Sequence, residues 1–246
     1  MYKLGRKAIK ADSRTLRMHR YMMPHLPPPP PSVDYAGGLK DWGMMKNDEL
    51  GCCTIAAVGH AVQTWTQKIK GTPAPITDEL VLDHYEMWDG YNPDDPSSDE
   101  GGIELDVLND WHKESDGFGG HLLSAFAIAS PANLAEVRTS IYMFGGVYIG
   151  IGLPLAAQDQ AVWDVADGPD GVANSWGGHA VYVVGYDESG FTCVTWGALQ
   201  KMTTAFWRRY VDECYALLSQ DWLDNAGVSP YGLNLAQLTA DLARIR

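Results

Sequence analysis

The feature that most restricts the fold of this 246-residue chain is the order of its apolar patterns, which change near residue 146. Before that point, apolar side chains recur every three or four residues, the spacing of one face of an α-helix. The first and last of these segments end at glycines, Gly71 and Gly145, which are common helix stops. Four helices are predicted: over residues 55–69, after Thr77, over 103–114 and over 134–144.

After residue 146 the apolar residues are often β-branched and stand in short runs broken by glycine, a pattern typical of strands. Strands are predicted over residues 147–154, 179–187, 190–196 and 199–204. One more helix is predicted at the C-terminus, where Asn234 can cap the apolar residues Leu235, Leu238, Leu242 and Ile245. Helices first and strands later indicate an α+β fold with two lobes.

Charge is unevenly distributed along the chain. Residues 1–20 hold seven basic side chains against Asp12 alone, a net charge of +6, whereas the remaining residues hold 11 basic and 30 acidic side chains, a net charge of −19. The acidic body disfavours a nucleic-acid partner. We expect the basic arm to dock on an acidic protein surface, on its own body or in a larger assembly; a solvated tail is the alternative.

Five consecutive prolines in "PHLPPPPPS", residues 24–32, favour a stiff polyproline II strap behind this arm. The predicted division is therefore 1–35 for the arm and strap, 36–146 for a helical lobe, 147–215 for a β lobe, and 216–246 for an extension with the terminal helix. The acidic stretch between Asp78 and Asp116 lacks the alternation of a calcium loop and is interpreted as a solvated loop. If it lined a substrate site, it would favour basic substrates.

Several classes of protein are disfavoured by what the chain lacks. It has no run of 18 apolar residues for a membrane span and no apolar secretory signal. Its cysteines, Cys52, Cys53, Cys193 and Cys214, do not follow the spacing of a zinc site, so neither a metal nor a cofactor is predicted. Free cysteines indicate a reducing compartment.

The segment "KNDELGCCTIAAVGHAVQTW" places two adjacent cysteines at the predicted start of a helix. A thiol there has a lowered pKa and lies near backbone N–H groups that can stabilise an oxyanion, which suits Cys53 as a nucleophile. His60 is about 10 Å further along the same helix, so it is interpreted as a packing residue. His179, which opens a strand behind two glycines, is the better candidate for the base.

These segments carry a resemblance to a known family. "NDELGCCTIAA", followed 126 residues later by "GGHAVYVVGYD" and then by "GFTCVTWGA", resembles the papain-like cysteine peptidases, most closely their bacterial and bacteriophage-encoded relatives. The resemblance covers about residues 40–215. It implies a helical lobe led by the cysteine helix and an antiparallel β-barrel lobe that carries the histidine. A strap crossing the site would resemble the pro-segments of this family.

The resemblance also implies roles for individual residues. Cys53 matches the nucleophile, His179 the general base, and Asn47 the carboxamide that completes the oxyanion hole. The asparagine that orients the histidine in the family is replaced by Val194, which leaves the neighbouring Thr195 as the candidate orienter.

Two residues are secondary candidates. Cys52 falls on the small residue before the nucleophile and is alternatively a second thiol. Asn174 begins "NSWGG", which spells the motif of the family but precedes His179, and it is an alternative orienter.

The resulting prediction is a papain-like thiol hydrolase, a peptidase or amidase that acts by Cys–His acyl transfer on a peptide or amide substrate and is weakened by the missing asparagine. The alternative is a structural or interaction protein on the same fold, such as a phage virion component that docks through residues 1–35. Either protein would be cytoplasmic or carried in a phage particle. A redox protein using the vicinal thiols is a third, disfavoured reading.

Overall fold

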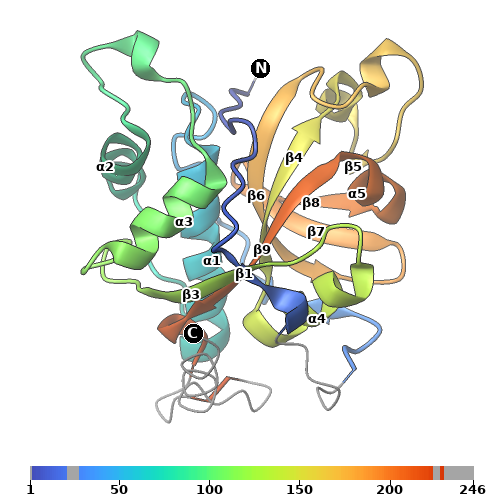
Figure 1. Ribbon diagram of the computed structural model, residues 1–246, viewed down its shortest axis with the longest axis horizontal. Helices are drawn as coiled ribbons and strands as arrows, with labels where there is room; N and C mark the ends of the chain where they lie inside the picture. Colours follow the sequence, from blue (N-terminus) through green and yellow to red (C-terminus); the bar gives the residue numbers. More distant parts are fainter. Residues whose placement is uncertain (1, 21–27, 224–227, 230–246) are drawn as a thin grey trace.

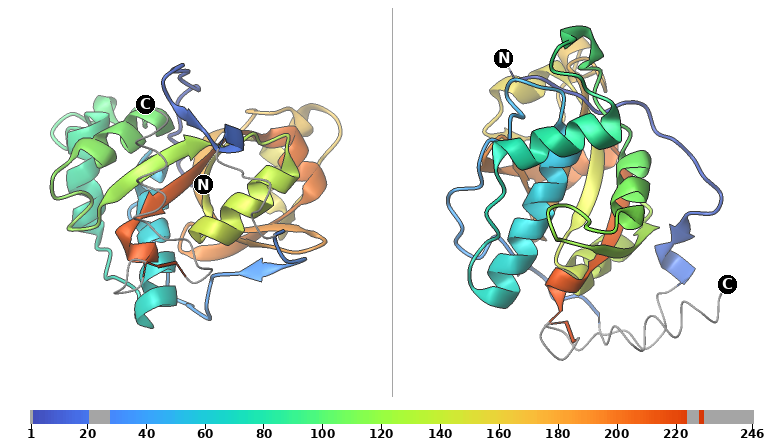
Figure 2. Two further views of the ribbon diagram at one scale, coloured as in Figure 1. Left: turned by 60° about the horizontal axis from the view of Figure 1, so that its bottom comes forward. Right: turned by 90° about the vertical axis from the view of Figure 1, so that its left-hand side faces the viewer.

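The computed structural model describes residues 2–20, 28–223 and 228–229 (Figure 1). Helices α1, α2 and α3 lie on one side of the molecule, and strands β5, β7 and β8 lie on the other (Figures 1 and 2). The described α-helices are α1 (Cys53–Lys70), α2 (Asp78–Asp89), α3 (Glu104–Lys113), α4 (Leu134–Phe144) and α5 (Thr204–Tyr210).

The four helices predicted before residue 146 are all present, and local signals fix their ends. Thr77 caps α2 by accepting a hydrogen bond from the Leu80 N–H, and Asn133 caps α4 in the same way. Gly71 and Gly145 end α1 and α4 with positive φ, which glycine adopts without strain. The apolar periodicity was therefore a sufficient guide to these helices.

The described strands form one sheet in the order β1-β3-β9-β4-β6-β7-β8-β5, with β2 paired to β6. The pairs β1–β3 and β5–β8 are parallel and the others are antiparallel. The strands are β1 (Leu16–Arg17), β2 (Val33–Asp34), β3 (Leu123–Ile128), β4 (Val147–Leu153), β5 (Val162–Trp163), β6 (Gly177–Tyr186), β7 (Gly190–Thr195), β8 (Ala198–Thr203) and β9 (Val211–Ser219).

The predicted antiparallel β-barrel is wrong, because the sheet is mixed and open. Among the described residues, its edge strands β1 and β5 each pair on one side only and do not meet. The four strands predicted after residue 146 are confirmed as β4, β6, β7 and β8. Two long strands were not predicted: β3 within the helical segment, and β9, which continues past residue 215.

The core lies where α1 packs against β6. Trp65 of α1 stacks on Trp111 of α3 and meets Tyr182 of β6 edge-on, with ring centroids 6.1 and 5.9 Å apart. The Trp65 indole also donates to the Phe144 carbonyl, and the Tyr148 hydroxyl donates to the Thr54 carbonyl. Burial of these aromatic side chains fixes α1, and with it the adjacent cysteines, against the sheet.

Two predicted features fall wholly or partly outside the described residues. The terminal helix after Asn234 lies outside them, as does the first half of the proline strap. Of the rest of the strap, the Pro30 carbonyl accepts a hydrogen bond from the Tyr186 hydroxyl. No helix within the described parts of the chain has both the length and the apolar character to cross a membrane.

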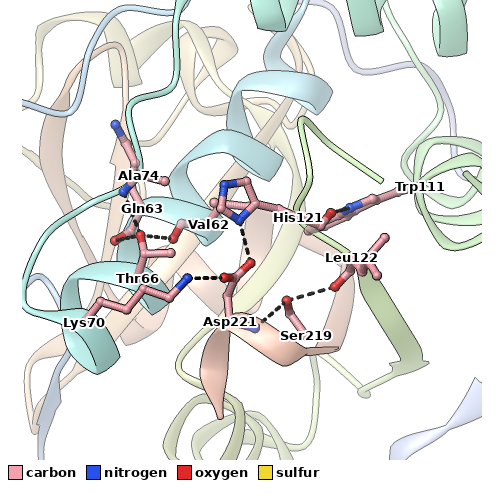
Figure 3. A network of polar contacts seen from close by, with 10 residues as sticks. All are labelled: Val62, Gln63, Thr66, Lys70, Ala74, Trp111, His121, Leu122, Ser219 and Asp221. Atoms are coloured by element: carbon pink, nitrogen blue, oxygen red, sulfur yellow. Dashed lines mark hydrogen bonds and ion pairs between the residues drawn. The ribbon is translucent and has the colours of Figure 1, made fainter. Parts of the chain in front are cut away.

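A polar network joins the end of α1 to the segment that follows β9 (Figure 3). Asp221 lies at its centre, in the short helix η5 (Gln220–Trp222). Its carboxylate lies 2.6 Å from His121 Nδ1 and 3.0 Å from Lys70 Nζ. Burial raises the pKa of Asp221, but the hydrogen bonds from His121 and Lys70 outweigh it and hold the pKa below its usual range.

Asp221→Asn is expected to lower the free energy of unfolding at pH 7 by about 1–3 kcal/mol, since it removes charge-assisted hydrogen bonds. The folded-state pKa lies below the unfolded value, so this stability is present above about pH 4 and disappears as the pH falls further. Urea denaturation at pH 7 and pH 3 measures both effects. The control is Asp110→Asn, which breaks an exposed pair with Lys113; an equal loss in both variants would contradict the prediction.

Candidate active site

Cys53 is the first residue of α1 and is fully buried. Backbone hydrogen bonds from Ala180 of β6 and from Gly5 of the arm reach its sulfur. Burial nevertheless raises the pKa of the thiol to about 11, although these two hydrogen bonds oppose the change. The expected lowering of the pKa by the helix N-terminus is therefore overturned in this state, because loss of solvent outweighs the favourable backbone groups.

His179 lies on β6, directly before Ala180, whose backbone touches the Cys53 sulfur. Its Nε2 is 2.7 Å from the Thr195 hydroxyl at the end of β7, and its Nδ1 is buried without a hydrogen-bond partner among the described residues. The ring also stacks on Trp196, with centroids 4.5 Å apart and planes 12° from parallel. The imidazole is thus held at one nitrogen and on one face while its other nitrogen stays free.

The thiol and the imidazole are both neutral in this arrangement. Burial, and to a lesser extent the positive charge of Arg6 and the neighbouring His60, lower the pKa of His179 to about 3. A high thiol pKa and a low imidazole pKa oppose transfer of the Cys53 proton to His179. In the described state, Cys53 and His179 therefore lack the thiolate that nucleophilic attack requires.

Asn47, the expected oxyanion-hole residue, is also buried near the start of α1. Its backbone N–H donates to the Met44 carbonyl at 3.1 Å, and its Oδ1 is buried without a hydrogen-bond partner among the described residues. The preceding Met45 and Lys46 both have positive φ, at 56° and 57°. This tight backbone turn brings the carboxamide to the protein interior instead of to solvent.

The secondary candidates have other contacts. The Cys52 thiol donates to the Met45 carbonyl at 3.4 Å, and burial raises its pKa well above the usual range. Asn174 packs against Gly152, whose carbonyl accepts its backbone N–H at 3.1 Å, whereas the His179 Nε2 is occupied by Thr195. These positions do not place either residue in contact with the imidazole.

His60 lies inside α1, as a packing residue would. Its Nδ1 is 3.2 Å from Gln63 Oε1, and its ring meets Trp42 edge-on. The described residues contain no group of three or more His, Cys, Asp or Glu side chains that could hold a metal ion.

Comparison with solved structures places the whole arrangement in a known fold. A cysteine protease from Xylella fastidiosa, xylellain, superposes with a TM-score of 0.65 at 15% identity, over 87% of this chain and 95% of that one. This chain has a papain-like cysteine protease fold. ProCathepsin B S9 from Trypanosoma congolense gives a TM-score of 0.58 at 12% identity, over 88% of this chain and 86% of that one.

A Carica candamarcensis cysteine protease, solved with E-64, gives a TM-score of 0.52 at 14% identity, over 76% of this chain and 98% of that one. No family model and no curated protein sequence matches the chain. At these identities the likeness shows the papain-like fold alone, so the roles of individual residues depend on the geometry described above.

The N-terminal arm runs across the candidate site, between α3 and β6 (Figure 1). The Arg6 N–H donates to the Gly178 carbonyl at 3.1 Å, next to His179. On the other side, the Lys7 N–H donates to the Gly102 carbonyl and the Gly102 N–H donates to the Gly5 carbonyl, each at 2.8 Å. The arm therefore pairs with backbone on both sides of Cys53 and shields it from solvent.

Gly5 is the point at which the arm passes closest to the body. A methyl group there would lie 1.8 Å from the Gly51 carbonyl oxygen, which precedes the two cysteines. A methyl group at Gly101 would in turn lie 1.6 Å from the Gly5 carbonyl oxygen. Because both obstacles are backbone atoms, any side chain at Gly5 would displace the arm.

The basic residues of the arm dock on the acidic stretch of their own body, the first of the partners expected from the charge pattern. Lys3 pairs with Asp99, whose side chain is 3% exposed, and the Lys10 Nζ lies 2.6 Å from Asp106 Oδ1. The interpretation of this acidic stretch as a solvated loop holds for residues 92–97, which are exposed, but is wrong for Asp99. Asp99 is drawn inward because it also accepts hydrogen bonds from the Gly51 N–H and the Tyr85 hydroxyl.

Several residues around the site were not identified from the sequence. Trp196 covers the His179 ring and is itself stacked on Tyr2 of the arm, with centroids 4.6 Å apart. Its φ of 47° and the following Gly197 mark a tight turn. The letters "TWG" could therefore have indicated from the sequence that a turn places Trp196 here. The Gly102 backbone and the buried Glu104 had no comparable signal, because their importance depends on where the arm lies.

Proposed function

We propose that this protein is a thiol hydrolase of peptides or amides in which Cys53 is the nucleophile and His179 the general base. The setting of His179 carries the proposal: its ring is fixed by Thr195 at Nε2, its Nδ1 is unbonded, and the backbone of the next residue, Ala180, acts on the Cys53 thiol. An imidazole oriented at one nitrogen, with the other left for a thiol, is the arrangement that nucleophilic catalysis requires.

In the proposed reaction, the Cys53 thiol proton moves to His179 Nδ1 and the thiolate attacks the carbonyl carbon of the substrate. The resulting oxyanion is stabilised by the backbone N–H at the start of α1 and by the Asn47 carboxamide. The imidazolium then gives its proton to the leaving amine as the C–N bond breaks, which leaves a thioester on Cys53. A water molecule, deprotonated by His179, hydrolyses the thioester and releases the acid.

Thr195 is the proposed orienter of the histidine. A hydroxyl at 2.7 Å fixes the ring as a carboxamide would, whereas Val194, in the position of the usual asparagine, is buried in the core. Since Trp196 also fixes the plane of the ring, the missing asparagine weakens the site without disabling it.

The proposal requires that the arm leaves the site before catalysis. While it is docked, both titrating groups are buried and neutral, and a backbone hydrogen bond from Gly5 reaches the sulfur that a substrate would approach. The arm would thus act as a pro-segment does in proteases that are made inactive.

A structural or interaction protein on the same fold is the second candidate, and the complete burial of Cys53 under the arm favours it. On this reading residues 1–35 dock on a larger assembly, such as a phage particle. Reactivity of Cys53 after displacement of the arm separates the two candidates.

The test uses full-length protein with Gly5→Ala, which displaces the arm, and Cys52→Ser, which removes the neighbouring thiol. We expect rapid iodoacetamide labelling of Cys53 at pH 7 and hydrolysis of a fluorogenic peptide library. Both should fall sharply with His179→Ala but persist with His60→Gln, a control for loss of a buried histidine. Labelling unaffected by His179→Ala, with no hydrolysis, would support the structural role.

In the same background, Thr195→Val is expected to lower the labelling rate by roughly tenfold, the effect of losing one neutral hydrogen bond. Thr195→Ser keeps the hydroxyl and should stay within about twofold of the parent. The pH profile of labelling checks whether Thr195 positions the imidazole, because loss of the bond should also shift the apparent pKa of the pair. Identical profiles for the valine and serine variants would exclude this role.

A further inference from the structure

The Arg6 side chain of the arm is buried among three carboxylates, with only 4% of it exposed. Its Nη2 lies 2.6 Å from Asp212 Oδ1 and 2.8 Å from Glu213 Oε2, both on β9. Its Nε lies 3.5 Å from Oε1 of Glu104, the first residue of α3. The guanidinium thus donates hydrogen bonds through Nη1 and Nη2 to the two carboxylates on β9, and its Nε forms only a longer ion pair with Glu104.

The arm delivers this side chain from a position next to the candidate nucleophile. A backbone hydrogen bond links Gly5 to the Cys53 sulfur, and the following N–H, that of Arg6, donates to the Gly178 carbonyl beside His179. An extended chain that reaches Cys53 along the same two backbone edges would also direct a side chain toward the three carboxylates. One extended chain can thus reach both the carboxylate pocket and Cys53.

The pocket is shaped for a long side chain. A methyl group at Gly150 of β4 would lie 2.2 Å from Arg6 Nε, so glycine is what leaves the space open. The Tyr215 hydroxyl donates to Glu213 and fixes the orientation of that carboxylate. The Glu213 carboxylate is therefore preorganised within β9 and does not depend on the arm for its position.

Glu104 is the most deeply buried of the three carboxyl groups. It is 1% exposed, and neither of its side-chain oxygens has a hydrogen-bond partner among the described residues. Burial and the neighbouring Glu213 raise its pKa well above the usual range, and Arg6 opposes this. Once the arm leaves, two buried carboxyl groups face each other without a counter-ion, which is unfavourable until a cation enters.

We propose that Glu104, Asp212 and Glu213 form the specificity pocket of this hydrolase and select substrates that carry an arginine side chain. This inference rests on the proposed function of the adjoining site. Arginine is preferred to lysine because only the guanidinium has separate donors for Glu104 and for the pair on β9. A neutral side chain leaves the carboxylates unpaired, so we expect arginine to exceed leucine by about 100-fold in kcat/KM.

The experiment uses full-length protein with Gly5→Ala and Arg6→Ala, which displaces the arm and empties the pocket. Fluorogenic peptides with one arginine placed at each position in turn are compared with the matching leucine peptides. Hydrolysis gives kcat/KM, and fluorescence anisotropy with the additional change Cys53→Ala gives binding without chemistry. The second readout does not depend on catalysis.

Paired variants identify the pocket. Glu104→Gln with Glu213→Gln removes both buried carboxyl groups and should reduce the arginine preference to below about tenfold. Glu100→Gln, at a carboxylate 73% exposed, is the matched control and should leave the preference unchanged. If the double variant fails to fold, Asp212→Asn at the pocket rim serves instead, with an expected loss of several-fold in the preference.

Each outcome is decisive. An arginine preference at one position that depends on these carboxylates supports the proposal, in hydrolysis or, if no peptide is hydrolysed, in binding. Hydrolysis without any arginine preference would contradict the proposed specificity pocket but not the proposed hydrolase activity. Arginine-selective binding without hydrolysis overturns the hydrolase and retains the pocket as a binding site. Absence of both overturns the two proposals together.

Discussion

Gly5→Ala is expected to speed alkylation of Cys53 at pH 7 by at least about 20-fold. Burial under the arm raises the pKa of this thiol to about 11, and displacement of the arm returns it toward the unperturbed value of about 8.5. The thiolate fraction then rises roughly 300-fold, and part of this gain is offset because a less basic thiolate is a weaker nucleophile. Iodoacetamide labelling followed by mass spectrometry measures the rate at Cys53.

The matched control for this prediction is Ala11→Ser, which also adds one heavy atom to the arm but at an exposed position. It should label as slowly as the parent protein. The pH profile provides a second check, since the apparent pKa should fall in the alanine variant and not in the control. Slow labelling in a folded Gly5→Ala protein would mean that something other than the arm suppresses Cys53.

Arg6→Ala is expected to lower the free energy of unfolding by about 3–5 kcal/mol, because it leaves the buried Glu104 and Glu213 without their cation. For a chain of this length each kcal/mol corresponds to roughly 2–4 °C in Tm. Arg6→Lys keeps the charge but not the planar fork, so it should lie between the parent and the alanine variant. Chemical denaturation and thermal melting both measure the loss.

Arg14→Ala is the matched control, because the Arg14 side chain is 89% exposed and pairs only with the nearby Asp12 among the described residues. It should change stability by less than about 0.5 kcal/mol. Equal small losses in the two arginine variants would show that the Arg6 pairs do not hold the arm. The Gly5→Ala labelling would then have to be explained by the glycine contacts alone.

The residue pattern was enough to locate the elements whose periodicity or end signals are local. Helices α1 to α4 show helical spacing, α1, α2 and α4 end at glycines, and strands β4 and β6 to β8 are β-branched runs. The sequence "VDECYALLS" of β9 has no such alternation, because this strand is central in the sheet and nearly all of its residues are buried. The expected barrel was wrong because closure depends on which edge strands meet.

For the site, the residue pattern was enough to indicate that Cys53 begins a helix, that His179 opens a strand behind two glycines, and that Thr195 follows the missing asparagine position. Three features required the folded chain: Thr195 holds the imidazole, Arg6 fills a carboxylate pocket, and burial raises the pKa of the Cys53 thiol. The physical reason is that burial and counter-charge are set by segments far apart in the chain. Local spacing fixes which groups are available, and packing fixes which of them lose water and which acquire a partner.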